Sequence, residues 1–256
     1  MAAGGHPEAL ALDYRSDALA VWARAGQLYG SDLPASGRPR RPQRLGPAGG
    51  HLRVAALLSD DNRAMVMWAL DSAGRTRVYL DHSAAGVRFG APQLLESFAD
   101  PGGRASPAGS PQLIRLSSES VMAAWAGAAA GHWVLRVAPI DQRGLRTVST
   151  IAAPGGDALL DALAPGPRGD AMILWSQPAL SQPGRPEPAR QSLQAARGVE
   201  AAPGVARFGP PELVAPPGPV SGATLAIDPG SDLALAAWLG EGGSIRWSAR
   251  SGTPSG

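Results

Sequence analysis

The sequence predicts an all-β fold built from about five repeated units of four strands. Three observations predict it. A tryptophan closes a short apolar run five times along the chain. The 256 residues include 33 glycines and 25 prolines, which is typical of a chain with many turns. The 3.6-residue periodicity of amphipathic helices is missing, and glycine or proline interrupts nearly every stretch long enough to form a helix.

The repeat is visible in two unrelated motifs. The apolar runs end at Trp22, Trp68, Trp125, Trp175 and Trp238, at spacings of 46, 57, 50 and 63 residues. A second motif, Phe89-Gly90-Ala91-Pro92, returns 119 residues later as Phe208-Gly209-Pro210-Pro211, which is about two repeat lengths. Two motifs that keep one period indicate a structural repeat.

Each repeat reads as four strands separated by turns. In the second repeat we expect strands at 52–59, 63–70, 76–81 and 87–95, with turn residues at 59–62 and 71–74. The same order fits the other repeats. The predicted repeats, taken together as a single domain over residues 1–256, are 8–47, 51–97, 111–153, 157–215 and 222–250.

The second strand of each repeat is apolar on both faces, which selects the architecture. Ala64, Val66 and Trp68 point one way from their strand, and Met65 and Met67 point the other. Such a strand is covered by a sheet on each side. Radial repetition of four-stranded blades, the β-propeller, supplies this geometry. The sequence stops soon after the third strand of the fifth repeat, so we expect an incomplete last blade. Five blades in this chain are favoured over a piece of a larger ring or an assembly of chains.

The repeats resemble those of bacterial β-propeller proteins, in the group that includes sialidase-like and WD40-like propellers. The resemblance covers about Glu8 to Arg250. The sialidase Asp-box, Ser-x-Asp-x-Gly-x-Thr-Trp, is absent, and no repeat tryptophan is followed by the aspartate typical of WD40 repeats. The resemblance therefore implies a fold and transfers no functional residue. Related repeats are frequently extracytoplasmic, so that location is favoured, although the given chain begins without a signal-peptide pattern.

Charge and composition exclude several function classes. The formal net charge is +2, and all 23 basic residues are arginine, so the clustered positive charge of a nucleic-acid binder is missing. One short cluster, Arg38, Arg40, Arg41 and Arg44, is predicted to be solvated. There is no cysteine, and the four histidines are scattered, so we expect neither a metal site nor a cofactor. No apolar run is long enough to span a membrane.

Four residues are candidate ligand-binding positions. Arg53 and Arg115 lie in apolar first strands, where a planar guanidinium could grip an anionic ligand. The alternative is that they pair with Asp161 or with carbonyl oxygens. Asp161 is itself a candidate because it lies in a first strand and begins no turn, its alternative being a hydrated side chain. Trp133, like Trp247, either stacks on a sugar or packs between blades.

The sequence thus favours a non-enzymatic β-propeller binding or interaction module for a protein or glycan ligand. The alternative is a carbohydrate-active enzyme, a glycoside hydrolase with its site at the channel mouth. That activity needs two carboxylates flanking the scissile bond, and the first strands contain few acids. A nucleophilic tyrosine of the sialidase type has no convincing acid beside it. Converging carboxylates would favour the enzyme, and aliphatic residues with arginine would favour the module.

Overall fold

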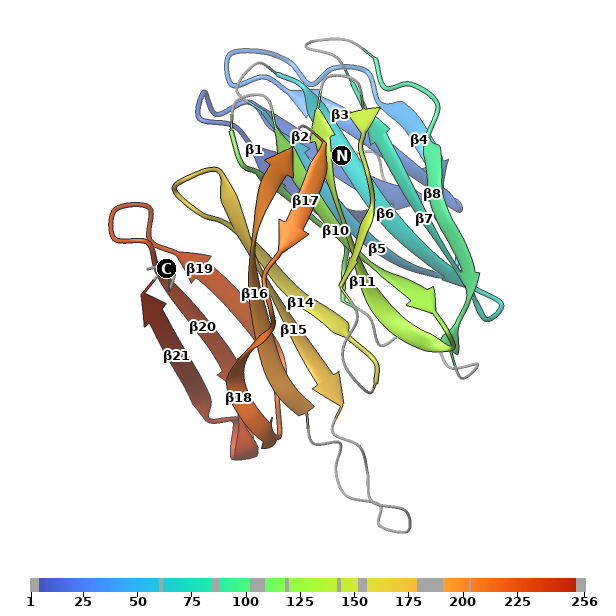
Figure 1. Ribbon diagram of the computed structural model, residues 1–256. Coiled ribbons are helices and arrows are strands. Elements are labelled where there is room, and N and C mark those ends of the chain that lie inside the picture. Colours follow the sequence, from blue (N-terminus) through green and yellow to red (C-terminus); the bar gives the residue numbers. More distant parts are fainter. Residues whose placement is uncertain are drawn as a thin grey trace. The chain divides into compact units, whose positions relative to one another are not determined.

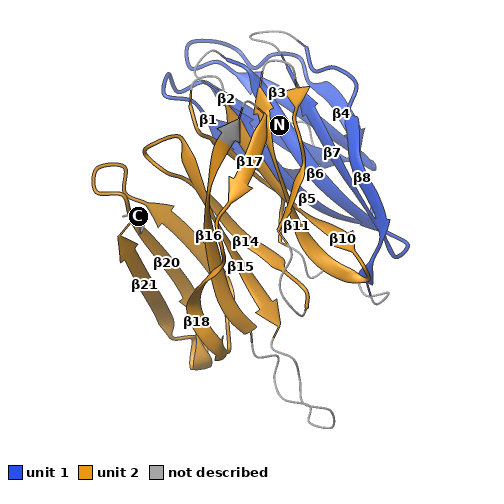
Figure 2. Cartoon of the chain, in the orientation of Figure 1, with its two compact units in different colours: residues 1–106 blue, residues 107–256 orange. Residues whose placement is uncertain are grey.

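The computed structural model describes residues 5–59, 62–83, 88–101, 109–117, 120–141, 144–151, 156–178, 191–202 and 204–251. Strands make up most of these residues (Figure 1). The chain divides into two compact units, residues 1–106 and 107–256 (Figure 2).

Unit 1 contains two four-stranded antiparallel sheets. The first has the order β1 (His6–Leu12), β2 (Ala18–Arg24), β3 (Gln27–Leu33), β4 (Gln43–Pro47). The second has the order β5 (His51–Leu58), β6 (Ala64–Ser72), β7 (Arg75–His82), β8 (Gln93–Ala99). Each sheet is a meander in which every strand pairs with the one before it in the chain.

Unit 2 contains three sheets. The first is formed by β9 (Gln112–Arg115), β10 (Val121–Ala129) and β11 (His132–Asp141), with β12 (Gly144–Leu145) and β13 (Ser149–Ile151) both paired to β11. The next is formed by β14 (Leu159–Pro165), β15 (Asp170–Pro178) and β16 (Gln191–Ala202), with β17 (Val205–Phe208) and β18 (Glu212–Gly218) both paired to β16. The last is formed by β19 (Ser221–Ile227), β20 (Leu233–Leu239) and β21 (Ile245–Ser251), with a 3-10 turn, η2 (Glu241–Gly243), before β21.

These sheets confirm the predicted fold class. Each sheet falls on one predicted repeat, and we call them blades 1 to 5 in chain order. The last blade has three strands, as expected from the sequence. In blade 4 the fourth strand is split, because Pro210 and Pro211 lack the backbone N–H that a continuous ladder needs. That all five blades form one domain stays a prediction.

The turns between second and third strands use one geometry three times. Ala25 and Gly26 have φ of 48° and 71°, Ala73 and Gly74 have 52° and 69°, and Ala130 and Gly131 have 49° and 79°. Two successive residues with positive φ make the type I′ turn, whose twist matches that of the flanking strands. Glycine adopts the positive φ of the second position without the steric cost that alanine carries at the first. The hairpins at these three places are therefore locally specified.

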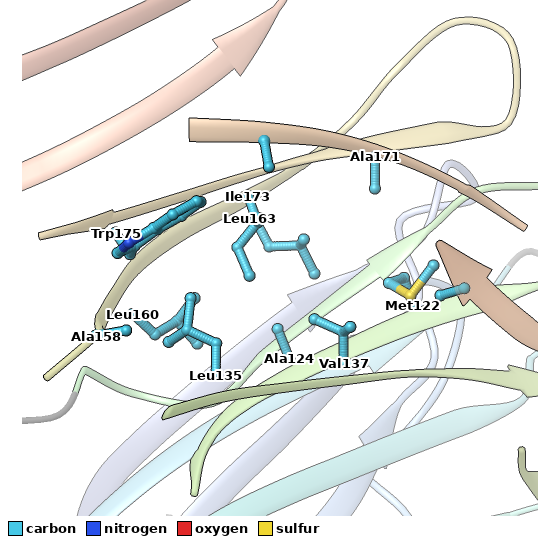
Figure 3. Packing of buried hydrophobic residues seen from close by; sticks show 12 residues of the cluster. Met122, Ala124, Leu135, Val137, Ala158, Leu160, Leu163, Ala171, Ile173 and Trp175 are labelled. Carbon is cyan, nitrogen blue, oxygen red and sulfur yellow. The ribbon is translucent and has the colours of Figure 1, made fainter. Parts of the chain in front are cut away.

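The blades of each unit pack face to face through the repeat tryptophans. In unit 1, Trp68 of β6 is fully buried in a cluster with Leu19, Val21 and Leu45 of blade 1. In unit 2, Trp175 lies in the cluster that contains Leu135 of blade 3 (Figure 3). Trp238 packs on the cluster that contains Leu174 of blade 4. In all three cases the tryptophan of one blade faces the blade that precedes it in the chain.

Burial of the second strands follows the prediction in the middle blades and departs from it in blade 5. All residues of β6 except the last are buried, and β10 is buried from Val121 to Gly127. In β20 burial alternates, so that Leu233 and Leu235 are exposed while Ala234 and Ala236 are buried. Blade 4 covers one face of blade 5, and no other described blade of unit 2 covers the second face.

Removal of a repeat tryptophan should destabilise the protein strongly. Trp68 and Trp175 are fully buried, so Trp68→Ala or Trp175→Ala should each lower the free energy of unfolding by about 3–5 kcal/mol. Trp247→Ala is the matched control, because Trp247 is 68% exposed and a surface substitution changes stability by about 0.5 kcal/mol or less. Denaturant unfolding measures all three. Equal midpoints for the Trp68 and Trp247 variants would contradict the blade packing.

Candidate functional site

Asp161 lies at a β-bulge in the first strand of blade 4. The register of β14 and β15 pairs Leu160 with Trp175 and Ala162 with Leu174, so Asp161 is an extra residue opposite the repeat tryptophan. A bulge of this kind interrupts the ladder and redirects a side chain. Asp161 is therefore positioned by a local distortion of its strand.

The surroundings of Asp161 desolvate its carboxylate. It accepts hydrogen bonds from the hydroxyl and the backbone N–H of Ser176, and burial raises its pKa to about 6 against these two bonds. Its Oδ2 is buried and has no hydrogen-bond partner among the residues that the structure describes. Buried carboxylate oxygens normally accept a hydrogen bond. Oδ2 of Asp161 therefore lacks a hydrogen-bond donor that such an atom usually has.

An equivalent acid in blade 1 escaped the sequence analysis. In β1, Pro7 pairs with Trp22 and Ala9 pairs with Val21, so Glu8 is the extra residue of a bulge opposite its repeat tryptophan. Glu8 and Asp161 both stand 14 residues before that tryptophan. This shared distance was the signal in the sequence that could have identified Glu8.

Glu8 lies on the wall of an apolar groove in unit 1. The groove has a volume of about 650 Å³. Its apolar lining includes Leu10, Trp22 and Leu33, and its polar lining includes Glu8 and Arg40. Trp22 stacks on Tyr29 of the same blade, with ring centroids 6.1 Å apart. All four residues of the predicted basic cluster are exposed, and Arg40 lies 3.8 Å from the Asp32 carboxylate.

Arg53 is paired inside unit 1, with a partner that the sequence analysis did not expect. The guanidinium is 8% exposed and donates to both carboxylate oxygens of Asp71 on the neighbouring strand, at 2.7 and 2.9 Å. The Thr76 hydroxyl lies 2.8 Å from Asp71 Oδ1 and 2.6 Å from Asp100 Oδ1, so it can donate to one of them at a time. Burial lowers the pKa of Arg53, and the Asp71 charge opposes that effect. The geometry thus gives Arg53 a role in the fold.

The other two candidates lie in unit 2. Arg115 is half-buried at the end of β9, in register with Val121. Trp133 is 2% exposed, and its backbone N–H donates to Asp157 Oδ1 at 2.8 Å. A buried ring has no free face for a sugar, so the packing alternative fits Trp133 better. Ligand-binding roles for Arg115 and Asp161 stay predictions.

Blades 4 and 5 share an ionic cluster in unit 2. Arg197 of β16 donates to the carboxylates of Asp170 and Asp232. A second cavity, of about 750 Å³, lies beside it and is lined by Arg197, Glu212 and Arg250. Arg250 is itself 3.4 Å from Glu212. These charges compensate one another across the contact between the two blades.

In the described part of the chain, nowhere do three or more histidine, aspartate or glutamate side chains gather as metal ligands would. None of its helices has the length and apolar character needed to cross a membrane.

Comparison with known proteins identifies the fold and no family. No family model and no curated protein matches the chain. Hydrazine synthase from Kuenenia stuttgartiensis is similar at 14% identity and a TM-score of 0.53, over 92% of this chain and 64% of that one. An α-L-arabinofuranosidase from Fusarium graminearum has 11% identity and a TM-score of 0.46, over 96% and 91%. A sialidase from Streptococcus pneumoniae has 14% identity and a TM-score of 0.43, over 84% and 32%. The similar structures are β-propeller enzymes, which agrees with the predicted fold class.

Breaking the Arg53–Asp71 pair should destabilise the protein. Arg53→Ala leaves the buried Asp71 charge without its guanidinium, so the free energy of unfolding should fall by about 3–5 kcal/mol. The matched control is Arg146→Ala, because Arg146 pairs with Asp141 in a more exposed setting, with side chains 29% and 34% exposed, where a pair is worth about 0–1 kcal/mol. Urea unfolding of both variants provides the measurement. A parent-like Arg53→Ala variant would show that Arg53 is not needed for the fold.

The raised carboxyl pKa values should make stability depend on pH. Asp81 on β7 is 2% exposed, and burial raises its pKa to about 6, against hydrogen bonds from the backbone N–H groups of His82 and Gly90. The protonated form is favoured in the folded state, so its stabilising effect is full below about pH 4 and is lost as the pH rises through about 6. Asp81→Asn should therefore gain stability relative to the parent between these pH values. A constant difference in unfolding free energy across this range would refute the assignment.

Proposed function

We propose that the protein is a non-enzymatic binding module that holds a carbohydrate ligand at Asp161. The observation that carries the proposal is the buried Oδ2 of Asp161, which has no hydrogen-bond partner among the described residues. An unsatisfied buried acceptor costs about 1–3 kcal/mol, and a ligand hydroxyl that donates to it would remove that cost. Sugars present several such hydroxyls on a rigid ring.

The placement of Asp161 supports the same proposal. It lies in a first strand, at a bulge that redirects its side chain. The first strands β9 and β19 lie beside β14 in unit 2, and β9 contributes Arg115. Of the four residues singled out in the sequence, we retain Asp161 and Arg115 for the ligand, because they lie on neighbouring first strands of unit 2, whereas Arg53 lies in unit 1 and the Trp133 ring is buried.

The carboxylates support binding without catalysis. A glycosidase of the common kind needs a second carboxylate about 5–10 Å from the first. The pKa of Asp161 is raised by burial and lowered only by its bonds to Ser176, so no neighbouring carboxylate among the described residues accounts for its shift. A single carboxyl group can bind a hydroxyl without cleaving a glycosidic bond.

A second candidate function is glycoside hydrolysis with Asp161 as the general acid. A carboxyl group whose pKa is about 6 remains partly protonated near neutral pH, as a proton donor must. Two of the similar structures are an arabinofuranosidase and a sialidase, and their names agree with this candidate better than with a non-enzymatic module. Since their similarity extends to the fold alone, the carboxylates must decide between the candidates.

One set of variants separates the two functions. We expect no hydrolysis of aryl glycosides or oligosaccharides by the purified chain, and binding to at least one member of a glycan array. Binding should survive Asp161→Asn, because its amide oxygen can still accept from Ser176 while its NH2 group, in the place of Oδ2, donates to the oxygen of a sugar hydroxyl. It should weaken about tenfold in Asp161→Leu, since a lost buried hydrogen bond costs about 1.4 kcal/mol. Arg115→Ala should weaken it as well.

Two outcomes would contradict the proposal. Turnover that vanishes in Asp161→Asn while the circular dichroism spectrum is unchanged would establish the hydrolase. Glycan binding that is equal in the parent and in Asp161→Leu would remove Asp161 from the binding site.

A further inference from the structure

The third strand of blade 5 has an unpaired edge. β21 pairs with β20 residue for residue from Ile245 to Ser251, and no other described strand pairs with it. In blades 1 to 4 the third strand pairs with β4, with β8, with β12 and β13, or with β17 and β18. All eight described strands of unit 1 belong to its own two sheets, so none of them is a fourth strand for blade 5. An unpaired edge presents a row of backbone donors and acceptors to which a further strand can add.

In two blades the fourth-strand region carries a phenylalanine that packs on the preceding blade. Phe89 of blade 2 packs on the cluster that contains Leu45 of blade 1. A Cβ atom placed on Gly30 of blade 1 would lie 3.5 Å from the Phe89 ring. Phe208 of blade 4 packs in the same way on the cluster that contains Val137 of blade 3. An aromatic ring therefore accompanies the fourth strand into these two contacts.

Two positions of the preceding blade meet this ring. The first is the third-strand residue directly after the one paired with the repeat tryptophan. The second is the fourth-strand residue directly after the partner of that paired residue. In blades 1, 3 and 4 these two positions are Gly30 and Leu45, Val137 and Ile151, and Ala195 and Val214.

In blade 4 the same two positions line a cavity. Ala195 and Val214 belong to the wall of the cavity of about 750 Å³ described above, and β21 of blade 5 contributes Ser248 and Arg250 to it. All of these residues belong to unit 2. A cavity therefore lies between blades 4 and 5 where the contacts of blades 2 and 4 with their preceding blades hold a phenylalanine ring.

The register of β21 identifies the residue that would face the ring. Ser83 pairs with Phe89 in blade 2, and Gly198 pairs with Phe208 in blade 4. Both stand four residues after the partner of the repeat tryptophan, and in blade 5 that place belongs to Arg250. A guanidinium beside an aromatic ring makes a favourable cation–π contact. Arg250 is thus suited to hold an aromatic side chain in the cavity.

The charged groups around the cavity are paired with one another or with their neighbours. Arg197 donates to the carboxylates of Asp170 and Asp232, and Arg250 lies 3.4 Å from the Glu212 carboxylate. Apolar side chains form most of the remaining lining. An uncharged ring therefore fits this cavity better than an anionic or a cationic group.

We infer that blade 5 binds an extended segment of a partner protein as its fourth strand, antiparallel to β21, with an aromatic side chain in the cavity. The chain's own fourth strands define the chemistry of that segment. They share an aromatic residue, a glycine, any residue, a proline, a glutamine or glutamate and two aliphatic residues, as in 89–95 and 208–214. The inference is independent of the proposed carbohydrate site, because it uses neither Asp161 nor Arg115.

A labelled peptide tests the inference on the whole chain. The probe is a fluorescein-labelled peptide with the sequence of residues 206–215, and fluorescence anisotropy measures its binding. We expect saturable binding of one peptide per chain. The same peptide with Phe208→Ala should bind about tenfold more weakly, because it lacks the ring that fills the cavity. No binding by the first peptide, or equal binding by both, would overturn the inference.

A variant of the chain assigns the binding to β21. Ala249 corresponds in register to Arg197, whose carbonyl oxygen accepts from the backbone N–H of Gly209 in the fourth-strand region. The N–H and C=O of one residue point to the same neighbouring strand, so Ala249→Pro removes a donor from the free edge, where proline is tolerated. It should abolish binding. The matched control, Ala249→Gly, keeps the donor and should bind like the parent.

A second variant guards against a folding defect in Ala249→Pro. Ala195→Phe fills the cavity from blade 4 and should also abolish binding. Circular dichroism verifies that each variant is folded. Equal binding by the folded Ala249→Pro and Ala249→Gly chains, or by the folded Ala195→Phe chain and the parent, would overturn the inference. Sedimentation velocity that shows a parent dimer and an Ala249→Pro monomer would assign the edge to a second copy and overturn the partner segment.

Discussion

The contact between a repeat tryptophan and the preceding blade is the interaction on which the rest of the fold depends. A four-stranded sheet with two apolar faces cannot be stable alone, because both faces must leave water. The indole of Trp68 or Trp175 fills the centre of such a contact and is fully buried there. It also gives each contact a direction, since the tryptophan face and the opposite face of a blade are different surfaces.

The charged residues of the interior are paired with residues of opposite charge. Arg53 lies near the start of the apolar strand β5, and Asp71 on the neighbouring strand accepts a hydrogen bond from it at 2.7 Å. Arg197 joins Asp170 of its own blade to Asp232 of the next. In both cases the pairing compensates charges that the fold removes wholly or partly from water. These arginines are therefore explained by the fold, and Asp161, whose Oδ2 has no partner among the described residues, is not.

The sequence was sufficient to predict the repeated blades. It was insufficient to predict contacts that depend on how the strands pair. Five tryptophans and the Phe-Gly-x-Pro motif predicted the blades, because apolar strands at a fixed period have few other arrangements. The partner of Arg53 could not be predicted, since Asp71 is 18 residues away and only the strand register brings the two together. The burial of the Trp133 ring could not be predicted either, because the same strand pattern fits both a covered face and a half-exposed one. Glu8 was within reach, through its shared distance from a tryptophan.

Glu8 and Asp161 show that the same kind of β-bulge can place an acid in two different environments. Each acid is the extra residue of a bulge opposite a repeat tryptophan, so the backbone presents both in the same manner. Around Asp161 the neighbouring strands of unit 2 desolvate the carboxylate, and its pKa rises to about 6. Glu8 remains half-buried in a groove beside Trp22. The bulge places the acid, and the surrounding residues decide how far it is buried. Chemical character in this fold is therefore set by how far the strands around each bulge bury its acid.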